Sequence, residues 1–212
     1  MTGGGPRGHA LRWSFWAGAG GAGALIDGCP PGLALDEAET GARVLSGTFE
    51  GRTTGTPIGL EVTGGPGAPL KAAGAIARKV IEGVAIRAEA EGDSVTCIAE
   101  GVPAGWGAPA YARLDAEIAG AVGAIAGARR VEIGDGFAAA RLSGSQNADP
   151  MRAGATFLSN HAGGVLGGIA SGQPVVVRVG FDPLPEDAAA QVAAAMALVL
   201  ADQKLLHRAQ CG

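Results

Sequence analysis

The chain alternates between short apolar segments and loops that are rich in glycine and proline. Short runs of β-branched residues bounded by turn residues predict strands, because such side chains fit a pleated, half-buried surface. Runs of this kind occupy residues 44–49, 57–62, 84–88, 94–100, 131–133 and 175–179, and the apolar residues between 11 and 16 alternate like a short strand. The first two runs flank a polar loop, which predicts a hairpin.

Three longer segments predict helices, at residues 70–81, 114–126 and 188–206. The first and the last are apolar around most of their circumference, whereas a helix on a protein surface has one polar face. These two helices should therefore be buried on more than one side, and sheets on either side of them would bury them. The pattern predicts an α+β layered fold with apolar helices between mainly antiparallel sheets.

Composition refines this fold without changing its class. The 212 residues suit a single domain over residues 1–212, and 47% of them are hydrophobic, which is enough for a core. Glycine is abundant, at 38 residues, and aromatic residues are few, with five Phe, one Tyr and three Trp, so backbones should approach closely. Residues 1–24 are expected to be flexible, although the Gly/Ala tract at 17–24 fits either a linker or a packed backbone.

Charge, hydropathy and cysteine content exclude several classes of function. The net charge of −4 argues against a sequence-independent grip on nucleic acid, which needs an excess of Lys and Arg. No uninterrupted run of about 18 apolar residues is present, and the start lacks the layout of a secretion signal, so we expect a cytoplasmic protein without a membrane partner. Cys29, Cys97 and Cys211 are widely spaced, which predicts neither a disulfide framework nor a metal site.

Few residues could support chemistry. His161 could be a proton donor or a buried, hydrogen-bonded imidazole. Arg52, in a loop with three threonines, could bind an anion or lie at a solvated hairpin tip. The glycines at 134–136 and 163–168 could cradle a phosphate, but they lack the spacing of nucleotide-binding loops, and we favour tight turns and close packing. No Ser or Cys has a partner that would indicate nucleophilic catalysis.

A series of motifs along nearly the whole chain resembles one family. The motifs that carry the resemblance are Asp27-Gly-Cys-Pro-Pro-Gly32, Phe49-Glu-Gly-Arg-Thr-Thr-Gly-Thr-Pro-Ile58, Val131-Glu-Ile-Gly-Asp-Gly-Phe137 and Leu158-Ser-Asn-His-Ala-Gly-Gly164, with further matches at 73–79, 99–108, 171–174, 195–202 and 208–211. In this order they resemble chorismate synthase. Chance agreement over so many ordered motifs is negligible.

The resemblance implies a β-α-β sandwich, a homotetramer and binding of reduced FMN. Members of the family convert 5-enolpyruvylshikimate 3-phosphate to chorismate by loss of phosphate and a proton, and the flavin lends an electron transiently. The substrate carries a phosphate and two carboxylates. The resemblance therefore also implies a pocket in which arginines and two histidines hold charge and donate protons.

Most segments that carry this chemistry in the family are missing here. The Gly-Glu-Ser-His-Gly motif, with one catalytic histidine, falls where this chain has the Gly/Ala residues 17–21. An arginine-rich segment is missing between Leu35 and Arg43. A segment with the second histidine and a flavin-binding loop are missing between Glu61 and Leu70.

The site residues that the resemblance still implies are few. Flavin contacts of the family map to Gly167 and to Ala126 and Gly127, and of these only Gly167 is retained cleanly. The Lys-Pro-Thr-Ser-Ser motif maps to residues 182–186, which makes Asp182 a candidate catalytic residue beside His161; Asp182 could instead be the remnant of a Gly-Arg-His-Asp-Pro segment. The cations that could hold an anionic substrate are Arg12, Arg52, Lys71, Arg129, Arg130 and Arg178, of which Arg52 is the candidate substrate-binding residue.

Two functions therefore compete. The resemblance implies a chorismate synthase whose activity is impaired by the loss of both histidines. The alternative is a non-catalytic scaffold or binding module built from the same core. The missing segments are long loops, whereas the retained ones are strands, helices and tight turns.

Overall fold

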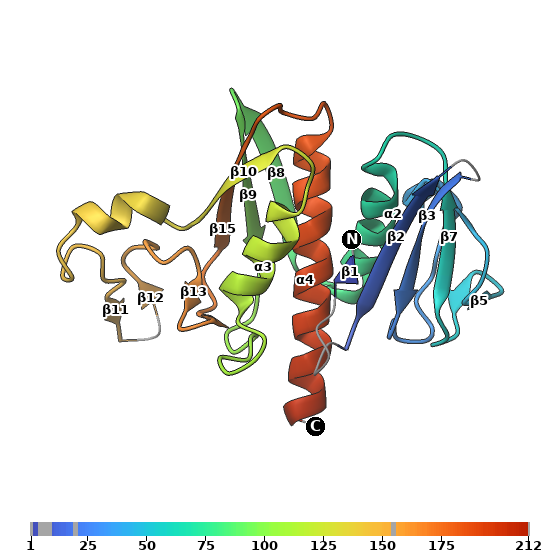
Figure 1. The fold of residues 1–212 in the computed structure, drawn as a ribbon. Coiled ribbons are helices and arrows are strands. Elements are labelled where there is room, and N and C mark those ends of the chain that lie inside the picture. The colour runs from blue at the N-terminus through green and yellow to red at the C-terminus, as the bar shows by residue number, and fades with distance from the viewer. Residues whose placement is uncertain (1, 4–9, 19–20, 154–155, 212) are drawn as a thin grey trace. The chain divides into compact units, whose positions relative to one another are not determined.

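The computed structural model describes residues 2–3, 10–18, 21–153 and 156–211 (Figure 1). The chain divides into two compact units, one made of residues 1–82 with 193–212 and the other of residues 83–192. Every strand pairing among the described residues is antiparallel. The predicted α+β class with antiparallel sheets is confirmed, while the single domain over residues 1–212 stays a prediction.

The main sheet of the first unit has five strands. Their order across the sheet is β1 (Thr2–Gly3), β2 (Arg12–Gly18), β3 (Gly21–Asp27), β7 (Ile58–Val62) and β4 (Ala42–Val44). Alternate residues point to opposite faces of a strand. In β3, Ala24 and Ile26 are fully buried, whereas Leu25 between them is 41% exposed. One face of this sheet is therefore core and the other is surface.

The Gly/Ala tract at 17–24 belongs to this sheet where it is described. Residues 17–18 end β2 and residues 21–24 begin β3, with Ala17 paired to Ala22. A Cβ added to Gly23 would lie 2.2 Å from the ring of Trp16, so the indole packs directly on the glycine backbone. Of the two alternatives for this tract, the packed backbone is the one observed.

The expected hairpin between residues 44–49 and 57–62 forms only in part. Residues 42–44 pair with β7, but the chain then turns at Gly47 (φ 83°). A Cβ at Gly47 would lie 2.7 Å from the Cα of Ile58, so only glycine fits there. The residues that follow form a separate small hairpin of β5 (Thr48–Phe49) and β6 (Arg52–Thr53).

The single turn α1 (Glu37–Thr40) precedes β4 and is capped by Asp36, whose side chain accepts from the Ala38 amide.

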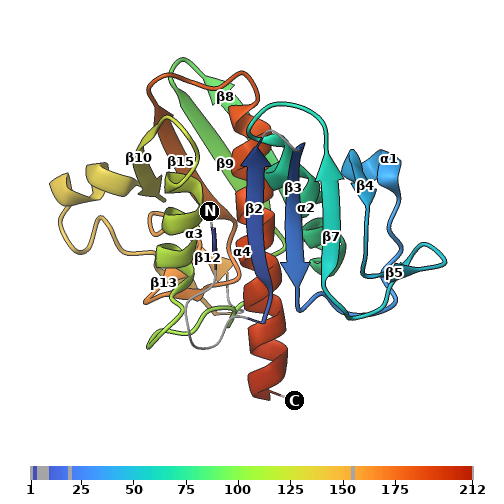
Figure 2. The ribbon, with the colours of Figure 1, turned by 45° about the vertical axis from the view of Figure 1, so that its right-hand side comes forward.

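The two apolar helices are buried, as predicted, and their bounds are α2 (Ala68–Val80) and α4 (Ala188–Cys211). Helix α2 packs on the core face of the sheet against β2, β3 and β7, as Figure 2 shows. On another side it meets α4, where a Cβ added to Gly74 would lie 2.4 Å from the Cβ of Ala194. Glycine opposite alanine lets the two helix backbones approach more closely than larger side chains would permit.

The C-terminal half of α4 ties distant parts of the first unit together. Its Asp202 is only 2% exposed, and Oδ1 of that side chain accepts hydrogen bonds from the amides of Ala10 (2.7 Å) and Leu11 (2.8 Å). Nζ of Lys204 donates to the carbonyl of Val80 at 2.8 Å, which satisfies a backbone acceptor at the end of α2. Gln203 is equally buried, but its amide has no hydrogen-bond partner in the described structure.

Helix α4 is long and apolar enough to cross a membrane by length and composition alone. However, 72% of the relevant window is buried within the protein, which is the behaviour of a core helix. It gives no evidence of membrane insertion.

The second unit is built on a four-stranded sheet with the order β10 (Ala128–Ile133), β15 (Val175–Phe181), β9 (Ser94–Glu100) and β8 (Ala85–Glu91). Its inward positions are β-branched or small, as in Val95, Val177 and Val179, all with no exposed area. Its other face carries ion pairs, including Arg87 with Glu100 at 2.8 Å. Helix α3 (Leu114–Gly123) packs against β10 and ends three residues before the predicted boundary.

The segment between β10 and β15 contains only short elements. These are the 3₁₀ helix η1 (Gly136–Arg141) and two small hairpins, β11 (Met151–Arg152) with β12 (Thr156–Phe157) and β13 (Val165–Leu166) with β14 (Ile169–Ala170). With little regular structure of its own, this segment depends on side-chain hydrogen bonds for its conformation.

The close contact of α2 with α4 predicts opposite effects for two Gly→Ala changes. Alanine favours a helix interior over glycine by about 1 kcal/mol, so Gly120→Ala, in α3 with open space around it, should raise the free energy of unfolding by up to that amount. Gly74→Ala should instead lower it by about 1–3 kcal/mol, because the new methyl group overlaps Ala194. Urea unfolding followed by circular dichroism measures both. Stabilisation by Gly74→Ala would contradict the close packing.

Candidate functional site

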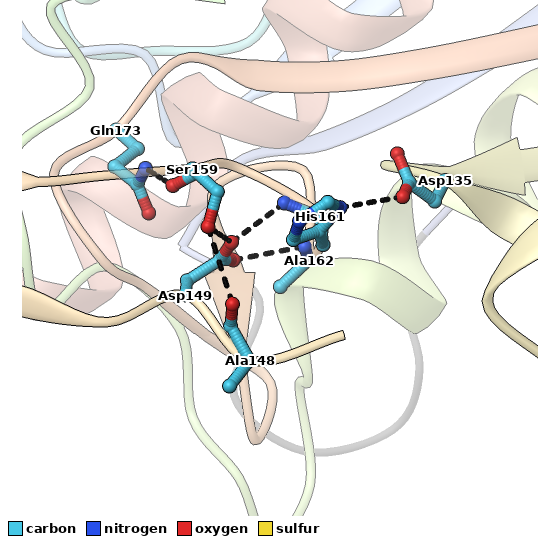
Figure 3. A network of polar contacts seen from close by, with 7 residues as sticks. All are labelled: Asp135, Ala148, Asp149, Ser159, His161, Ala162 and Gln173. Carbon is cyan, nitrogen blue, oxygen red and sulfur yellow. Dashed lines mark hydrogen bonds and ion pairs between the residues drawn. The ribbon is translucent and has the colours of Figure 1, made fainter. Parts of the chain in front are cut away.

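His161 lies in the loop between β12 and β13, where two aspartates hold it (Figure 3). Its Nδ1 is 2.6 Å from Oδ2 of Asp135, which belongs to the turn after β10. The amide of Asp135 also donates to the carbonyl of His161 at 2.9 Å. The side chain of His161 is 30% exposed, so the ring is neither buried nor freely mobile in solvent. Asp135 therefore fixes both the backbone and the ring of His161.

Asp149 holds the same loop from its amide side. Its Oδ1 accepts from the Ser159 hydroxyl (2.8 Å) and the His161 amide (2.7 Å), and its Oδ2 accepts from the Ala162 amide (3.0 Å). Partial burial opposes ionisation of this carboxyl, but the three hydrogen bonds outweigh it, so the pKa of Asp149 is lowered. The loop therefore binds a carboxylate that the chain itself supplies.

Further contacts connect this loop with the segment before β15. Nε2 of Gln173 donates to the carbonyl of Ser159 at 2.6 Å, and Nδ2 of Asn160 donates to the carbonyl of Pro174 at 2.9 Å. Oδ1 of Asn160 accepts from the amide of Gly164 at 2.7 Å. The position of His161 is thus determined from three directions.

The glycines of this region serve close packing. Gly134 has φ 59°, and a Cβ there would lie 2.1 Å from the carbonyl oxygen of His161. Gly163 has φ 62°, and a Cβ there would lie 2.3 Å from the Gly134 amide nitrogen. Both positions require glycine because the two turns touch backbone to backbone. The alternative of tight turns therefore accounts for these glycines, and their amides are engaged within the protein.

The arrangement at His161 is suited to proton transfer. An ionised carboxylate can only accept a hydrogen bond, so the contact with Asp135 places a proton on Nδ1. Nε2 then carries the lone pair of a neutral imidazole, and within the described residues it has no hydrogen-bond partner. A shallow, open depression of about 480 Å³ lies beside this loop, along α3 and β10, and is lined in part by Arg113, Val131 and Ala162.

The structure separates the predicted flavin contacts. Ala126 and Gly127 follow the C-terminal end of α3, whereas the carbonyl of Gly168, next to Gly167, accepts from Leu114 at the first residue of α3. The helix has ten residues, so its ends are about 15 Å apart. Gly127 is engaged elsewhere: its carbonyl accepts from the Asp182 amide at 2.7 Å, and a Cβ there would lie 2.4 Å from the carbonyl oxygen of Pro183.

Two of the predicted site residues thus meet each other but not His161. Asp182 follows directly on β15, is exposed and contacts Gly127 through its backbone. Arg52 belongs to β6 in the other unit, where its Nη1 donates to the carbonyl of Gly32 at 2.9 Å. The adjacent Thr53 hydroxyl bonds to the carbonyl of Pro30. This part of the motif therefore holds the proline-rich turn in place.

Three of the six candidate cations, Arg12, Arg130 and Arg178, have an anionic partner. Arg12 pairs with Asp27, and Arg113, beside the open depression, forms two contacts with Asp115, at 3.0 and 2.5 Å. The hydrogen bond from Arg113 is the largest cause of a lowered pKa for Asp115. Two further pairs on the outer face of the second sheet are Arg130 with Asp93 at 3.0 Å and Arg178 with Glu132 at 3.5 Å.

Neither a metal centre nor a reactive thiol is indicated among the described residues. No group of three or more His, Cys, Asp or Glu side chains there could hold a metal ion. Burial raises the pKa of the Cys29 thiol to about 11, so this cysteine is a poor nucleophile at neutral pH. Cys211 has no described side chain.

Sequence reasoning missed Asp135 and Asp149 as partners of His161. Asp135 stood in the Gly134-Asp-Gly136 motif, which was noted for its turn, and Asp149 lies in a polar loop without periodicity. The only signal was the presence of acidic residues in two loops that both border on short apolar segments. Such a signal does not specify which histidine the carboxylates meet.

Comparison with solved structures identifies the fold as one already known. The chain matches a protein described as "Crystal Structure of Chorismate Synthase" with a TM-score of 0.83 and 25% sequence identity, over 92% of each chain. The class of protein is therefore an α+β protein with the chorismate synthase fold.

Sequence comparison leads to the same family. A sequence profile described as "Chorismate synthase" matches residues 67–203. Curated chorismate synthases of Novosphingobium aromaticivorans and Rhizorhabdus wittichii are 38% and 37% identical, and each match covers 97% of this chain and 98% of the relative. The chain belongs to the chorismate synthase family. The alignment to the first relative runs over 349 positions although this chain has 212 residues, so many positions of the relative have no counterpart here.

The hydrogen bonds that the Asp149 carboxylate accepts predict a pH dependence of the free energy of unfolding. Because the folded-state pKa of Asp149 is lowered, its contribution is present above the pKa of an unfolded Asp, about 3.9, and is lost as the pH falls through the folded-state value. Asp149→Asn should lower the free energy of unfolding by about 1 kcal/mol at pH 7. In acid, the difference in this free energy between the variant and the unchanged protein should be smaller. Urea unfolding between pH 7 and the lowest pH that the fold tolerates measures this.

Asp182→Asn provides the matched control, since the same chemical change is made at an exposed carboxyl with no hydrogen bond to its side chain in the described structure. It should lower the free energy of unfolding at pH 7 by less than Asp149→Asn does, because it removes no side-chain hydrogen bond of the described structure. If the stability of both variants depended on pH to the same extent, the hydrogen bonds to Asp149 would not stabilise the fold.

Proposed function

We propose that the chain carries out the family's reaction weakly: it converts 5-enolpyruvylshikimate 3-phosphate to chorismate and phosphate with reduced FMN, at a rate far below that of a complete enzyme. Family membership supports an anionic small-molecule substrate and a place in aromatic biosynthesis. The observation that carries the impairment is the charge compensation of the remaining arginines.

The substrate has a phosphate and two carboxylates, and each needs a cation that is not already neutralised. Arg12, Arg130 and Arg178 are paired with carboxylates, so binding an anion there would first require breaking an ion pair. Among the residues that the structure describes, the guanidinium of Arg52 contacts a carbonyl and no carboxylate, so Arg52 remains the best candidate for substrate binding. Leaving several charged groups of a substrate without partners in a closed site costs several kcal/mol per group.

The flavin meets a similar difficulty. Family members use reduced FMN, which would lie against Gly167, Ala126 and Gly127 by the mapped contacts. These residues are at opposite ends of α3, and Gly127 is packed against Pro183. They do not form one cradle for a flavin. We therefore expect weak flavin binding and derive no chemical step through the cofactor.

His161 is the remaining candidate for proton transfer, and Asp182 is the second candidate catalytic residue. The loss of both family histidines should cost roughly 10²- to 10⁴-fold for each role. His161, oriented by Asp135, could replace one of these roles at most. Asp182 has the opposite charge to the lysine of the family motif, so it cannot replace that cation.

The alternative is a non-catalytic scaffold or binding module derived from the same core. It is favoured by the retention of strands, buried helices and glycine turns in a chain much shorter than its alignment to complete relatives. In this case the protein would need neither flavin nor substrate. By the same family relation we expect a soluble cytoplasmic protein that binds neither nucleic acid nor membrane.

An anaerobic assay tests the proposal directly. With reduced FMN and 5-enolpyruvylshikimate 3-phosphate, we expect chorismate to form well below about 1 s⁻¹, a rate at the low end for enzymes. His161→Gln should lower this residual rate by a further 10²- to 10⁴-fold, whereas His207→Gln, the matched control on α4, should not change it.

Flavin titration separates the two functions. Binding of reduced FMN together with slow turnover supports an impaired enzyme. A lack of flavin binding at high micromolar concentration would favour the scaffold, and turnover at or above about 1 s⁻¹ would contradict the impairment.

We also expect self-association, because large apolar side chains are exposed on the outer face of the five-stranded sheet. Trp16 and Leu25 alternate with core residues and are 45% and 41% exposed, and Leu45 beside Gly59 is 54% exposed. Sedimentation should give a mass above that of the monomer at micromolar concentration, and Leu25→Lys should lower it. A clean monomer for the unchanged protein would contradict this expectation.

A further inference from the structure

We propose that Asp135 is a positioning residue that holds His161 as the Nδ1–H tautomer and thereby reserves Nε2 for proton transfer. The inference deepens the proposed function, on which the role of Nε2 rests, but the tautomer can be measured without any turnover. The tight turn at residues 134–136 does not require an aspartate at position 135, so Asp135 would serve His161 and not the turn.

When the carboxyl of Asp135 is ionised, its hydrogen bond with His161 can run in one direction only. The 2.6 Å contact joins Nδ1 of His161 to Oδ2 of Asp135, and a carboxylate has no proton to donate. Nδ1 must therefore be the donor. A neutral histidine carries its proton on one ring nitrogen, and the hydrogen bonds of the ring decide which one. Donation from Nδ1 therefore leaves Nε2 without a proton.

The backbone of His161 is fixed by hydrogen bonds, so the residue cannot readily turn away from Asp135. Its carbonyl accepts from the Asp135 amide at 2.9 Å, and its own amide donates to Asp149 at 2.7 Å. Gly134 touches the same carbonyl so closely that a Cβ would lie at 2.1 Å. The backbone of the histidine is thus held on both sides, and only the ring torsions remain, which the contact with Asp135 restrains (Figure 3).

Two aspartates contact His161, one through the ring and one through the backbone. Asp135 meets the ring, whereas Asp149 bonds to the backbone amides of residues 161 and 162 and not to the ring. Two carboxylates thus act on one residue through different atoms. This division makes Asp149 a control for effects of the loop on the ring.

Proton transfer at this site balances simply. A proton leaves an acidic group of the substrate and binds the lone pair of Nε2, which produces an imidazolium with both nitrogens protonated. The Nδ1 proton stays in its hydrogen bond with Asp135, whose negative charge stabilises the cation. Return of the Nε2 proton to product or water restores the neutral ring.

Nitrogen-15 NMR of the histidine rings tests the assignment, since the chain has three histidines and His9 and His207 can be removed by substitution. For the neutral ring of His161 we expect the Nδ1–H tautomer in the unchanged protein and in Asp149→Asn. Asp135→Ala should lose this preference, and Asp135→Glu should restore part of it. Circular dichroism identifies any variant that fails to fold.

A kinetic cycle tests the role of the tautomer. Asp135→Ala and His161→Gln should each lower residual kcat by roughly 10²- to 10⁴-fold with KM nearly unchanged, and the double variant should be no slower than His161→Gln alone. A residue that only stabilises the loop would instead act additively with His161→Gln.

Three results would overturn the inference: an Nε2–H tautomer in the unchanged protein, a tautomer that Asp149→Asn alters as much as Asp135→Ala does, or additive kinetic effects. A complete lack of turnover would remove the proposed function. The NMR comparison would still decide whether Asp135 sets the tautomer.

Discussion

The fold depends on burying helices that have almost no polar face. Such helices cannot lie on a surface. Because the chain has few aromatic side chains, the backbones of these helices must approach their neighbours closely to fill the core. Gly74 opposite Ala194 is where this requirement is most exacting, because α2 meets α4 there while its other side packs on β2, β3 and β7. The high glycine content of the sequence thus has a mechanical reason: at sites such as Gly23 and Gly74 a neighbour occupies the space of a Cβ.

Periodicity and turn chemistry predicted much of this fold. The helices at 70–81 and 188–206 and the strands at 84–88 and 94–100 were correct in type and place, since each signal lies within one continuous segment. The departures have local causes that depend on distant residues. Residues 48–49 pair with residues 52–53 and not with β7, because the chain turns at Gly47. The site was less predictable still, because Asp135 and Asp149 reach His161 across 26 and 12 positions, and such side-chain contacts have no period.

The chemistry of the family and the architecture of its core are separable in this chain. The core needs apolar helices, antiparallel strands and glycine turns, and all of them are present. The chemistry needs cations with no anion beside them, whereas Arg12, Arg130 and Arg178 are partners of carboxylates. The loop of residues 159–162 illustrates the same change on a smaller scale, because its amides bind Asp149 rather than an external anion.

The buried carboxylate of Asp202 has a consequence for the order in which the chain is made. It binds the amides of Ala10 and Leu11, residues that a ribosome releases some 190 positions earlier. Residues 83–192 are continuous and can fold while synthesis proceeds, whereas the beginning of β2 must wait for the last helix. During this interval the segment that leads into β2, an inner strand of the sheet, lacks its hydrogen bonds to Asp202. The first unit therefore stays incomplete until α4 emerges from the exit tunnel, because residues 193–212 belong to it.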